Sequence, residues 1–486
     1  MKKIQDIQIN KVARPIKVIQ FGEGNFLRGF ADHMIDIANE KGVFDGNIAI
    51  IKPIAWGTVD TFKEQNSNYT LTLRGKLEGN VVNDHRIITS VCDTINPFDT
   101  YEAYADLAKC ETLEFVISNT TEAGIVFNGE DKIEEVLSST YPGKLTKFLL
   151  DRYTHFNGDA SKGLILLPVE LIEHNGKKLK ECILKYVELW QLEADFKAWI
   201  ENNNIFCDTL VDRIVTGYPQ EAEQIFEEIG YTDKLLVVAE PFGLWVIEGP
   251  AEVAKRFPLD KAGMNVVFTD NLKPYRERKV KLLNGAHTGT VLAGYLAGED
   301  IVRGCMEDKT IRTYMEQLMF DEIGTTINLP QDDVKAFANS VIERFENPFI
   351  DHSLLAISLN SVSKWKARIL PSMKDYVAAN GKLPKVITFS FAALMAFYYS
   401  QELNGSVLVG KRGNDTYEIK DDGDVLEFFA ENTAKLSMPE VVNAFASSTK
   451  FFGEDLTAYE GFVETVVKHL EDINMQGMKV TLEKLI

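Results

Sequence analysis

Short apolar runs alternate with longer amphipathic stretches through the first half of the chain. Continuous apolar runs bounded by glycine or polar residues are typical of strands buried on both faces of a parallel sheet. The runs interpreted as strands are Lys17–Phe21, Asn47–Lys52, Leu113–Asn119, Gly163–Pro168 and Lys234–Ala239. Helical periodicity lies between them, at 26–41 and 177–202, and an alternating segment at 69–74 before Gly75 and Gly79 predicts an inserted hairpin. Strands that alternate with helices predict an α/β fold with a Rossmann-type, doubly wound parallel sheet.

From residue 275 onward the pattern changes to the 3.6-residue period of amphipathic helices, and strand-like runs nearly vanish. The helical stretches are Lys279–Ala297, Thr310–Phe320, Asp332–Phe345, Ile387–Gln401 and Met438–Glu471. The chain has 486 residues, more than the roughly 250–300 at which a single hydrophobic core stops growing. We therefore predict a dinucleotide-binding domain at residues 1–270 and a mostly α-helical substrate and catalytic domain at 271–486.

Composition and charge exclude several classes of partner. Hydrophobic residues make up 45% of the chain, and the formal net charge is −20. A chain this acidic repels nucleic acids and anionic membrane surfaces, and no apolar run approaches the ~20 residues of a membrane span. The N-terminus lacks the apolar region of a secretory signal. These features predict a cytoplasmic protein with a small-molecule substrate, and they leave its oligomeric state open.

Cysteine and histidine spacing gives no support for a metal site. The five cysteines are scattered without a Cys-x-x-Cys pair, and no two of the seven histidines show the spacing of a zinc motif. Buried apolar thiols are the simplest interpretation.

The first apolar run leads into a glycine turn, Gly22-Glu23-Gly24, that is followed by a helical pattern. In a dinucleotide-binding turn the first glycine allows the tight bend, and the second lets the backbone approach a pyrophosphate. The third glycine of that fingerprint is replaced by Leu27. An ordinary strand-to-helix turn is the alternative, but the position after the first strand favours cofactor binding.

The second strand ends differently from that of a typical NAD-binding domain. A carboxylate there usually binds the ribose 2′-hydroxyl, whereas this chain has Lys52-Pro53. Lys52 can accept the 2′-phosphate of NADP, or it can be a solvated lysine at a strand end. We expect NAD as the cofactor and do not exclude NADP.

Three chemically suited residues follow one another at the start of the second domain. On an α-helix, Lys279, Asn284 and His287 lie at about 0°, 140° and 80°, in one sector. A lysine can act as general acid in carbonyl reduction and as general base in alcohol oxidation, without a metal. The amide and the imidazole can hydrogen-bond the reacting oxygen as it gains charge. A polar helix face with a satisfied histidine is the alternative.

The spacing Lys-x4-Asn-x2-His after a Rossmann half resembles the signature of the mannitol dehydrogenase family, the polyol-specific long-chain dehydrogenases and reductases. Further segments fit that family in order along the chain, over residues 16–370: Gly22–Phe30, Ser118–Gly124, Val211–Ile214, Glu240–Glu248 and Arg344–Pro348. The resemblance implies a Rossmann domain, a helical domain and an active site in the cleft between them.

The resemblance also implies roles for individual residues. Lys279 would be the acid/base, and Asn284 and His287 would surround the reacting oxygen. Asp212 would support the site, with a structural ion pair to Arg213 as the alternative; Glu122 would lie near the nicotinamide, with a plain turn carboxylate as the alternative. The residues expected to bind the cofactor are Phe21, Gly22, Gly24, Asn25, Phe26, Lys52, Thr121 and Glu122.

One departure points to a branch of the family. Where mannitol dehydrogenases carry an asparagine, this chain has Glu170, which resembles the branch that reduces tagaturonate to altronate with NADH. The same departure puts the role of that position in doubt, although we expect it to contact substrate. A uronate needs a cation for its carboxylate, and Lys364, Lys366 and Arg368 are candidates, unless they form only a basic helix face.

Three alternatives remain open at the level of sequence. A sibling enzyme would act on fructuronate or on a neutral polyol such as mannitol. A Rossmann methyltransferase shares the Gly-x-Gly turn but does not explain Lys279, Asn284 and His287. A non-catalytic nucleotide-sensing protein does not explain the intact acid/base residues.

Overall fold

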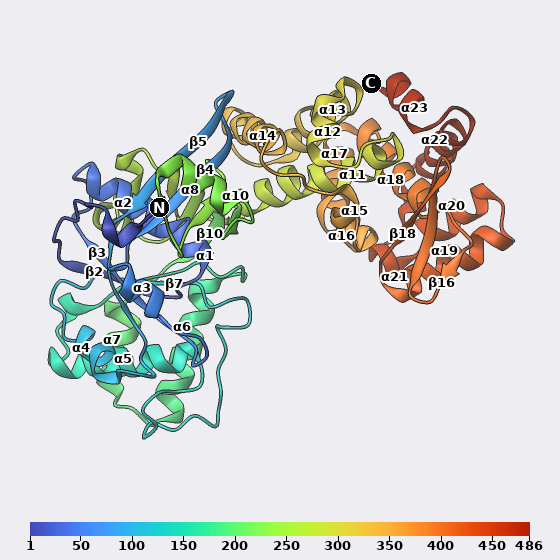
Figure 1. The fold of residues 1–486 in the computed structure, drawn as a ribbon. Helices are drawn as coiled ribbons and strands as arrows, with labels where there is room; N and C mark the ends of the chain where they lie inside the picture. The colour runs from blue at the N-terminus through green and yellow to red at the C-terminus, as the bar shows by residue number, and fades with distance from the viewer. The chain divides into compact units, whose positions relative to one another are not determined.

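The computed structural model describes all residues, Met1–Ile486, and divides into two compact units. The first unit comprises Met1–Arg74 and Val82–Leu272, and the second comprises Gly75–Val81 and Lys273–Ile486 (Figure 1). The short segment Gly75–Val81 is the tip of the predicted hairpin, formed by β4 (Tyr69–Leu77) and β5 (Asn80–Ile88).

A six-stranded parallel sheet forms the centre of the first unit. Its strands are β2 (Ile16–Phe21), β3 (Asn47–Ile51), β6 (Val91–Ile95), β7 (Phe115–Ser118), β8 (Ile165–Pro168) and β9 (Ile205–Phe206). They lie in the order β6-β3-β2-β7-β8-β9, and every neighbouring pair is parallel. This is the strand order of a Rossmann fold. Successive strands are added on one side of β2 as far as β6, and then on its other side from β7 onward. The predicted fold class is confirmed.

Alternating side chains of these strands supply two hydrophobic cores. Ile19 and Phe21 face one core, which also contains apolar residues of α4 (Tyr101–Leu107), α5 (Tyr141–His155), α6 (Asn175–Leu189) and α7 (Ala194–Asn203). Val18 faces the other core, which is shared with α2 (Ala31–Glu40) and with strands of two smaller sheets (Figure 1). A strand buried on both faces shows no polar alternation, which explains the continuous apolar runs.

Two smaller sheets combine the predicted hairpin and the predicted strand at 234–239 with other strands that the sequence pattern did not predict. One has the order β10-β14-β15, from β10 (Asp208–Asp212), β14 (Leu244–Glu248) and β15 (Val266–Thr269). The other has the order β11-β13-β4-β5, from β11 (Val215–Gly217) and β13 (Val237–Ala239) beside the hairpin. The apolar run at 234–239 therefore belongs to a separate mixed sheet, since β13 is parallel to β4 and antiparallel to β11.

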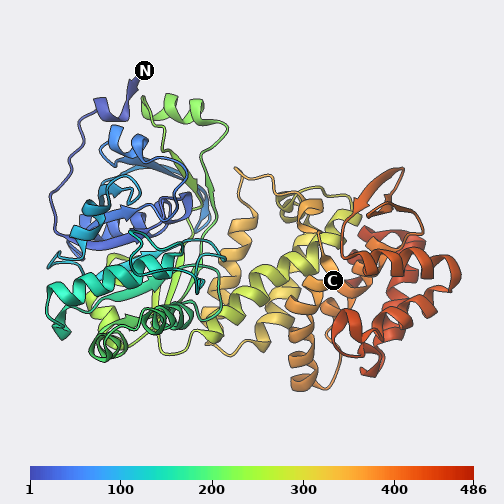
Figure 2. The ribbon, with the colours of Figure 1, turned by 90° about the horizontal axis from the view of Figure 1, so that it is seen from below.

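The second unit is mostly helical, as predicted, and is built around two packed helices. α18 (Lys385–Tyr398) is apolar on nearly all sides and buried along its length, so it occupies the centre of the unit. α11 (Gly285–Leu296) packs against it. Figure 2 shows the surrounding helices from a second direction. They include α13 (Lys309–Glu316), α14 (Gln331–Phe345), α16 (Ser361–Arg368), α17 (Leu370–Asn380), α19 (Gly423–Lys435), α20 (Met438–Ala446) and α22 (Phe462–Gln476).

The structure corrects several expected element boundaries. The expected helix at 177–202 is two helices, and the stretch at 438–471 is interrupted near Gly453 and Gly461, both with positive φ. Strands are present in the second unit, in a sheet of β16 (Leu403–Asn404), β17 (Val407–Arg412) and β18 (Asp415–Ile419). No helix in the structure is both long and apolar enough to span a membrane.

Candidate active site

The glycine turn after β2 has the shape that a dinucleotide requires. Gly22 has φ +127°, and a Cβ there would lie 2.9 Å from the backbone oxygen of Asn119, which follows β7. Any larger residue would therefore push two strand ends apart. At Gly24 a Cβ would meet no atom within 4 Å, so the turn has open space beside its second glycine. The residues present thus fit a pyrophosphate approaching the backbone.

Arg28 holds this turn in place. Its Nε donates to the backbone oxygen of Glu23 at 3.2 Å, and its Nη2 donates to Oδ1 of Asn25 at 2.6 Å. The expected helix at 26–41 is interrupted just after Arg28, because α1 (Asn25–Arg28) ends at Gly29 before α2 begins. The turn is therefore organised by a buried side chain as well as by its helix.

Beneath the turn, Arg28 lies over the ring of Tyr69. The hydroxyl of Tyr69 donates to Oδ2 of Asp32 at 2.7 Å. Burial raises the pKa of Asp32 to about 7, although Tyr69 and Arg28 oppose that shift. Arg28, Tyr69 and Asp32 thus form a buried polar cluster next to the turn, in which Oδ1 of Asp32 has no hydrogen-bond partner.

Lys52 follows β3 and is not a solvated lysine, because its side chain is only 1% exposed. Its Nζ lies 3.3 Å from Oε1 of Glu23 and donates to the backbone oxygen of Trp56. The lysine at the end of the second strand is thus paired with the carboxylate between the two turn glycines.

The turn after β7 contains a strained residue, Thr121, with φ +73°. Positive φ is unfavourable for a β-branched side chain and often marks a functional site. The neighbouring Thr120 donates through both its backbone nitrogen and its hydroxyl to Oε1 of Glu170, each at 2.9 Å. Ser118 donates to the other carboxylate oxygen at 3.1 Å. Glu122 is exposed in this turn.

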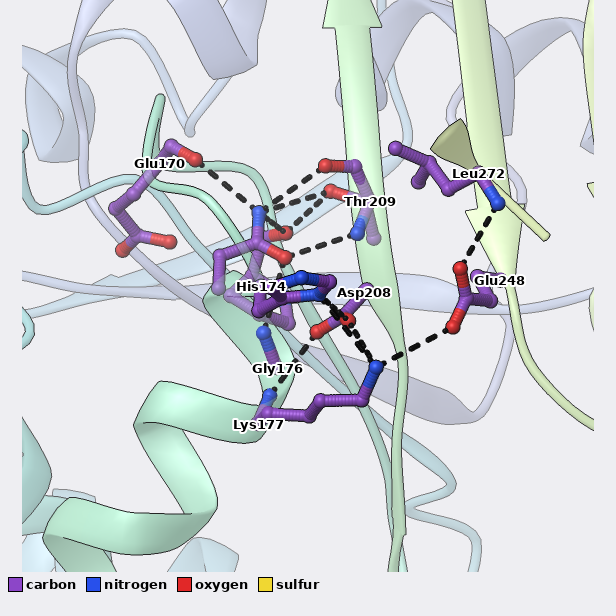
Figure 3. Close-up of polar contacts among 10 residues, drawn as sticks. Glu170, His174, Gly176, Lys177, Asp208, Thr209, Glu248 and Leu272 are labelled. Atoms are coloured by element: carbon purple, nitrogen blue, oxygen red, sulfur yellow. Dashed lines mark hydrogen bonds and ion pairs between the residues drawn. The ribbon is translucent and has the colours of Figure 1, made fainter. Parts of the chain in front are cut away.

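Glu170 is therefore engaged by the protein rather than projecting freely. It is 3% exposed, and burial raises its pKa against the opposing effect of these hydrogen bonds. The side chain of Asn175 continues the connection, donating to the backbone oxygens of Pro168 and Glu170 at 2.9 and 3.1 Å and accepting from the nitrogen of Thr209 at 2.9 Å. Figure 3 shows Glu170 and Thr209 of this set, beside the start of α6 and β10.

A charged network lies next to that connection (Figure 3). Asp208 is 2% exposed and lies 2.9 Å from Nδ1 of His174 and 3.1 Å from Nζ of Lys177. The same ammonium lies 3.5 Å from Glu248, whose other oxygen accepts from the nitrogen of Leu272 at 2.8 Å. These contacts join the start of α6 to β10, β14 and the last residue of the first unit.

Arg213 links two of the sequence motifs. It is 8% exposed and donates to the backbone oxygens of Gly29 at 2.7 Å and of Pro241 and Phe242 at 2.9 Å. It therefore connects the interruption after α1 with the Glu-Pro-Phe segment. Its neighbour Asp212 is 5% exposed at the end of β10.

In the second unit, the three candidate catalytic residues lie on one continuous helix that changes its winding. α10 (Lys273–Arg278) leads into the π-helical segment η4 (Lys279–Asn284), and α11 follows. In π-helical winding, hydrogen bonds join residues five apart, so such residues lie closer to the same helix face than they do in an α-helix. Lys279 and Asn284 are five apart, and η4 therefore aligns them more closely than the ~140° of an α-helix. His287 follows three positions later, on α11.

His287 is packed among rings and cations. Its ring centroid lies 4.1 Å from that of Phe345 and 5.4 Å from that of His352, and its Nδ1 is buried without a hydrogen-bond partner. Burial lowers the pKa of His287 to about 3, helped by His352, Arg344, Arg368 and Lys364. The imidazole is therefore neutral at physiological pH and has one N–H to donate.

Lys364 and Arg368 both lie near His287. Both lie on α16, and Arg368 donates from Nη1 to the hydroxyl of Thr288, next to His287, at 3.4 Å. Burial lowers the pKa of both cations. Lys366 instead lies against Gly453, where a Cβ would be 3.4 Å from its Nζ.

Comparison with known proteins identifies the family. Residues 16–261 match the Mannitol dehydrogenase Rossmann domain, and residues 271–474 match the Mannitol dehydrogenase C-terminal domain. The chain belongs to the mannitol dehydrogenase family. This confirms the resemblance of the sequence motifs, and it makes the chain an oxidoreductase that acts on CH–OH groups with a nicotinamide cofactor.

Relatives of known name within the family cover the whole chain. It is 43% identical to an altronate oxidoreductase of Yersinia enterocolitica, over 97% of each chain. It is 41% identical to an altronate oxidoreductase of Bacteroides thetaiotaomicron, over 100% of each chain. It is also 41% identical to an altronate oxidoreductase of Bacillus subtilis, over 97% of this chain and 95% of that one.

Solved structures share the fold at lower identity. A substrate-free D-sorbitol dehydrogenase superimposes with a TM-score of 0.75 at 22% identity, covering 99% of this chain and 100% of that one. A Pseudomonas fluorescens mannitol 2-dehydrogenase in ternary complex with NAD and D-mannitol superimposes with a TM-score of 0.61 at 21% identity, covering 97% of this chain and 94% of that one.

Several residues that organise the candidate site of this mannitol dehydrogenase family member could not be identified from the sequence. Arg28 and Glu23 stand inside a recognised motif, but only the structure shows what they hold. Asn175 and Asp208 join the start of α6 to β10, more than 30 residues away in sequence, so no spacing rule indicates them. No group of three or more His, Cys, Asp or Glu side chains is arranged to hold a metal ion.

Proposed function

We propose that this chain reduces D-tagaturonate to D-altronate with NADH, reversibly and without a metal: tagaturonate + NADH + H⁺ ⇌ altronate + NAD⁺. The observation that carries the proposal is 41–43% identity to altronate oxidoreductases over nearly the full length of both chains. The bound nicotinamide supplies or accepts the hydride, and the residues of the chain handle the proton, the oxygen and the substrate carboxylate.

Lys279 is the proposed proton donor in reduction and the proton acceptor in oxidation. Its position on η4 beside Asn284 supports this role, because the acid and an amide then face the same substrate atom. π-Helical segments also recur at functional sites.

Asn284 and His287 are proposed to hydrogen-bond the reacting oxygen. A neutral imidazole suits this task, since it donates one hydrogen bond without competing for the proton of the lysine. The pKa of about 3 for His287 keeps it in that form over the working pH range.

Lys364 and Arg368 are proposed to bind the carboxylate of the uronate. They are one helical turn apart on α16, and both lie among the charges that act on His287. Two partly buried cations near the reacting oxygen favour an anionic substrate over a neutral polyol. Glu170 is proposed to position the Thr120–Glu122 turn, because both of its carboxylate oxygens already accept hydrogen bonds.

The decisive experiment is NADH oxidation, followed by absorbance, with tagaturonate, fructuronate and fructose in parallel after treatment with a chelator. Fast turnover of tagaturonate, with the other two at least about tenfold slower in kcat/KM, is the expected result. Preference for fructuronate or fructose would contradict the substrate while keeping the family. Loss of activity with the chelator, restored by a metal, would contradict the metal-independent mechanism.

A further inference from the structure

The second strand of this chain ends without an acidic residue. In Rossmann domains an acidic residue near the end of the second strand usually accepts a hydrogen bond from the ribose 2′-hydroxyl. Here β3 ends at Ile51 and is followed by Lys52. The carboxylate next to that strand end comes instead from Glu23, in the glycine turn, whose Oε1 lies 3.3 Å from Nζ of Lys52.

Lys52 is poorly placed to receive a 2′-phosphate. Its side chain is 1% exposed, and its Nζ also donates to the backbone oxygen of Trp56. The chain then passes close over the ammonium, since a Cβ at Gly57 would lie 3.6 Å from Nζ. A phosphate group reaching this lysine would have to displace Glu23 or lie beside its negative charge.

Glu23 is held from two sides and remains accessible. Arg28 donates to its backbone oxygen at 3.2 Å, and Lys52 holds one carboxylate oxygen. The side chain is 24% exposed, and no hydrogen bond to its Oε2 is formed within the protein. A carboxylate fixed in this way, with one oxygen available, is suited to accept a hydrogen bond from a hydroxyl group.

We propose that Glu23 is the specificity-determining residue for the cofactor, binding the ribose 2′-hydroxyl of NADH and repelling the 2′-phosphate of NADPH, with Lys52 as its positioning residue. The turn thereby supplies the carboxylate that the second strand lacks. This inference deepens the NAD preference of the proposed function but does not depend on the substrate.

The test measures cofactor binding without substrate, by the fluorescence of NADH and NADPH titrated with protein. We expect wild type to bind NADH at least about tenfold more tightly than NADPH, because NADH gains a charge-assisted hydrogen bond from Glu23 whereas the 2′-phosphate of NADPH is repelled by it. In Glu23→Gln the preference should fall below about threefold, with NADPH bound more tightly than by wild type. Adding Lys52→Met to Glu23→Gln should abolish that gain for NADPH, because the released ammonium is then absent.

Two further variants keep the test decisive. Glu23→Asp keeps the charge and should still discriminate against NADPH, even if the Gln variant folds poorly. Glu64→Gln removes a surface carboxylate, paired with Lys234 at 2.9 Å, and serves as the matched control without effect on either cofactor. Equal affinity of wild type for both cofactors, or an unchanged preference in folded Glu23→Gln, would overturn the proposal. Neither result would depend on which sugar acid the enzyme reduces.

Discussion

Two π-helical segments in the second unit put the same backbone geometry to different uses. η4 presents Lys279 and Asn284 next to His287. η5 (Gln317–Ile323) follows α13 and presents Glu322, which is 5% exposed. The carboxylate of Glu322 accepts hydrogen bonds from the backbone nitrogens of Val386 and Ile387, both at 2.7 Å, at the start of α18.

π-Helical winding alone does not define a catalytic site. The wider π-helical winding changes the direction in which a side chain points. The groups that this side chain then contacts determine whether it serves structure or catalysis. Glu322 meets the unpaired N–H groups of the central helix, so it acts as a cap supplied by another element. Near η4, in contrast, the buried Nδ1 of His287 meets no protein partner. Substitutions in the two segments should therefore separate activity from stability.

The largest expected effect is on turnover, from Lys279→Ala in η4. Removing a general acid typically lowers the rate by roughly 10²–10⁴-fold, and we expect kcat to fall by that factor. Arginine at this position should not restore the rate, because guanidinium does not release its proton at working pH. Steady-state NADH oxidation measures both variants, with Lys382→Ala, an exposed lysine of the same unit, as control. A loss below about threefold would show that Lys279 is not the acid.

The complementary change in η5 should affect stability and spare turnover. Glu322→Ala leaves two buried N–H groups at the start of α18 unpaired, and each costs about 1–3 kcal/mol. We expect the free energy of unfolding to fall by about 2–6 kcal/mol in urea titrations. Glu322→Gln keeps one accepting oxygen and should lose about half as much. Unaltered kcat per folded molecule is expected; a large fall in kcat for well-folded Glu322→Gln would contradict the comparison.

The main strands were predictable because burial on both faces leaves a continuous apolar run. The winding of η4 was not, because helical periodicity assumes 100° per residue and contains no term for an inserted residue. Residue types nevertheless suggested the candidate residues, because a lysine, an amide and an imidazole within nine positions are suited to carbonyl reduction. The sequence could not show which side chains are already hydrogen-bonded within the protein. Glu170 is an example, because both of its carboxylate oxygens accept hydrogen bonds.

The missed sheet of the second unit had a signal in its turns. β16 and β17 are joined by Gly405-Ser406, and β17 and β18 by Gly413-Asn414, and both glycines have positive φ. Two-residue loops of this composition between alternating residues are typical of hairpins. The strands are short, and β16 and β18 are mostly polar, so the helical pattern around them dominated the prediction.

A moderate effect on NADH affinity is expected from Glu170→Gln in the first unit, where the carboxylate is already hydrogen-bonded within the protein. Glu170→Gln offers an amide N–H₂ toward donors on Ser118 and Thr120, and it should release the strained turn at Thr121. We expect NADH to bind about tenfold more weakly, which corresponds to about 1.4 kcal/mol. Fluorescence titration measures the affinity, and Glu181→Gln on the exposed side of α6 is the control. Unaltered NADH affinity would contradict the proposal that Glu170 positions this turn for the cofactor.

The last expected effect is a pH dependence of stability at His287. The unfolded histidine titrates near its ordinary value of 6.5, whereas the pKa of the folded one is lowered to about 3. Above pH 6.5 the imidazole is neutral in both the folded and the unfolded chain, so its protonation does not affect the free energy of unfolding. As the pH falls from 6.5 towards 3, the unfolded chain binds a proton that the folded chain does not, so His287 loses its stabilising contribution.

Comparison of wild type with His287→Gln isolates this contribution, because glutamine does not titrate. Urea unfolding at pH 8 and pH 5 should show the stability of wild type relative to the variant falling at the lower pH. Since His287 stays neutral in the folded enzyme, the wild-type profile of kcat/KM should have no step near pH 6.5 caused by this residue. An imidazole resonance of His287 that titrates near 6.5 by NMR in the folded protein would refute both expectations, and with them the neutral hydrogen-bond donor assigned next to η4.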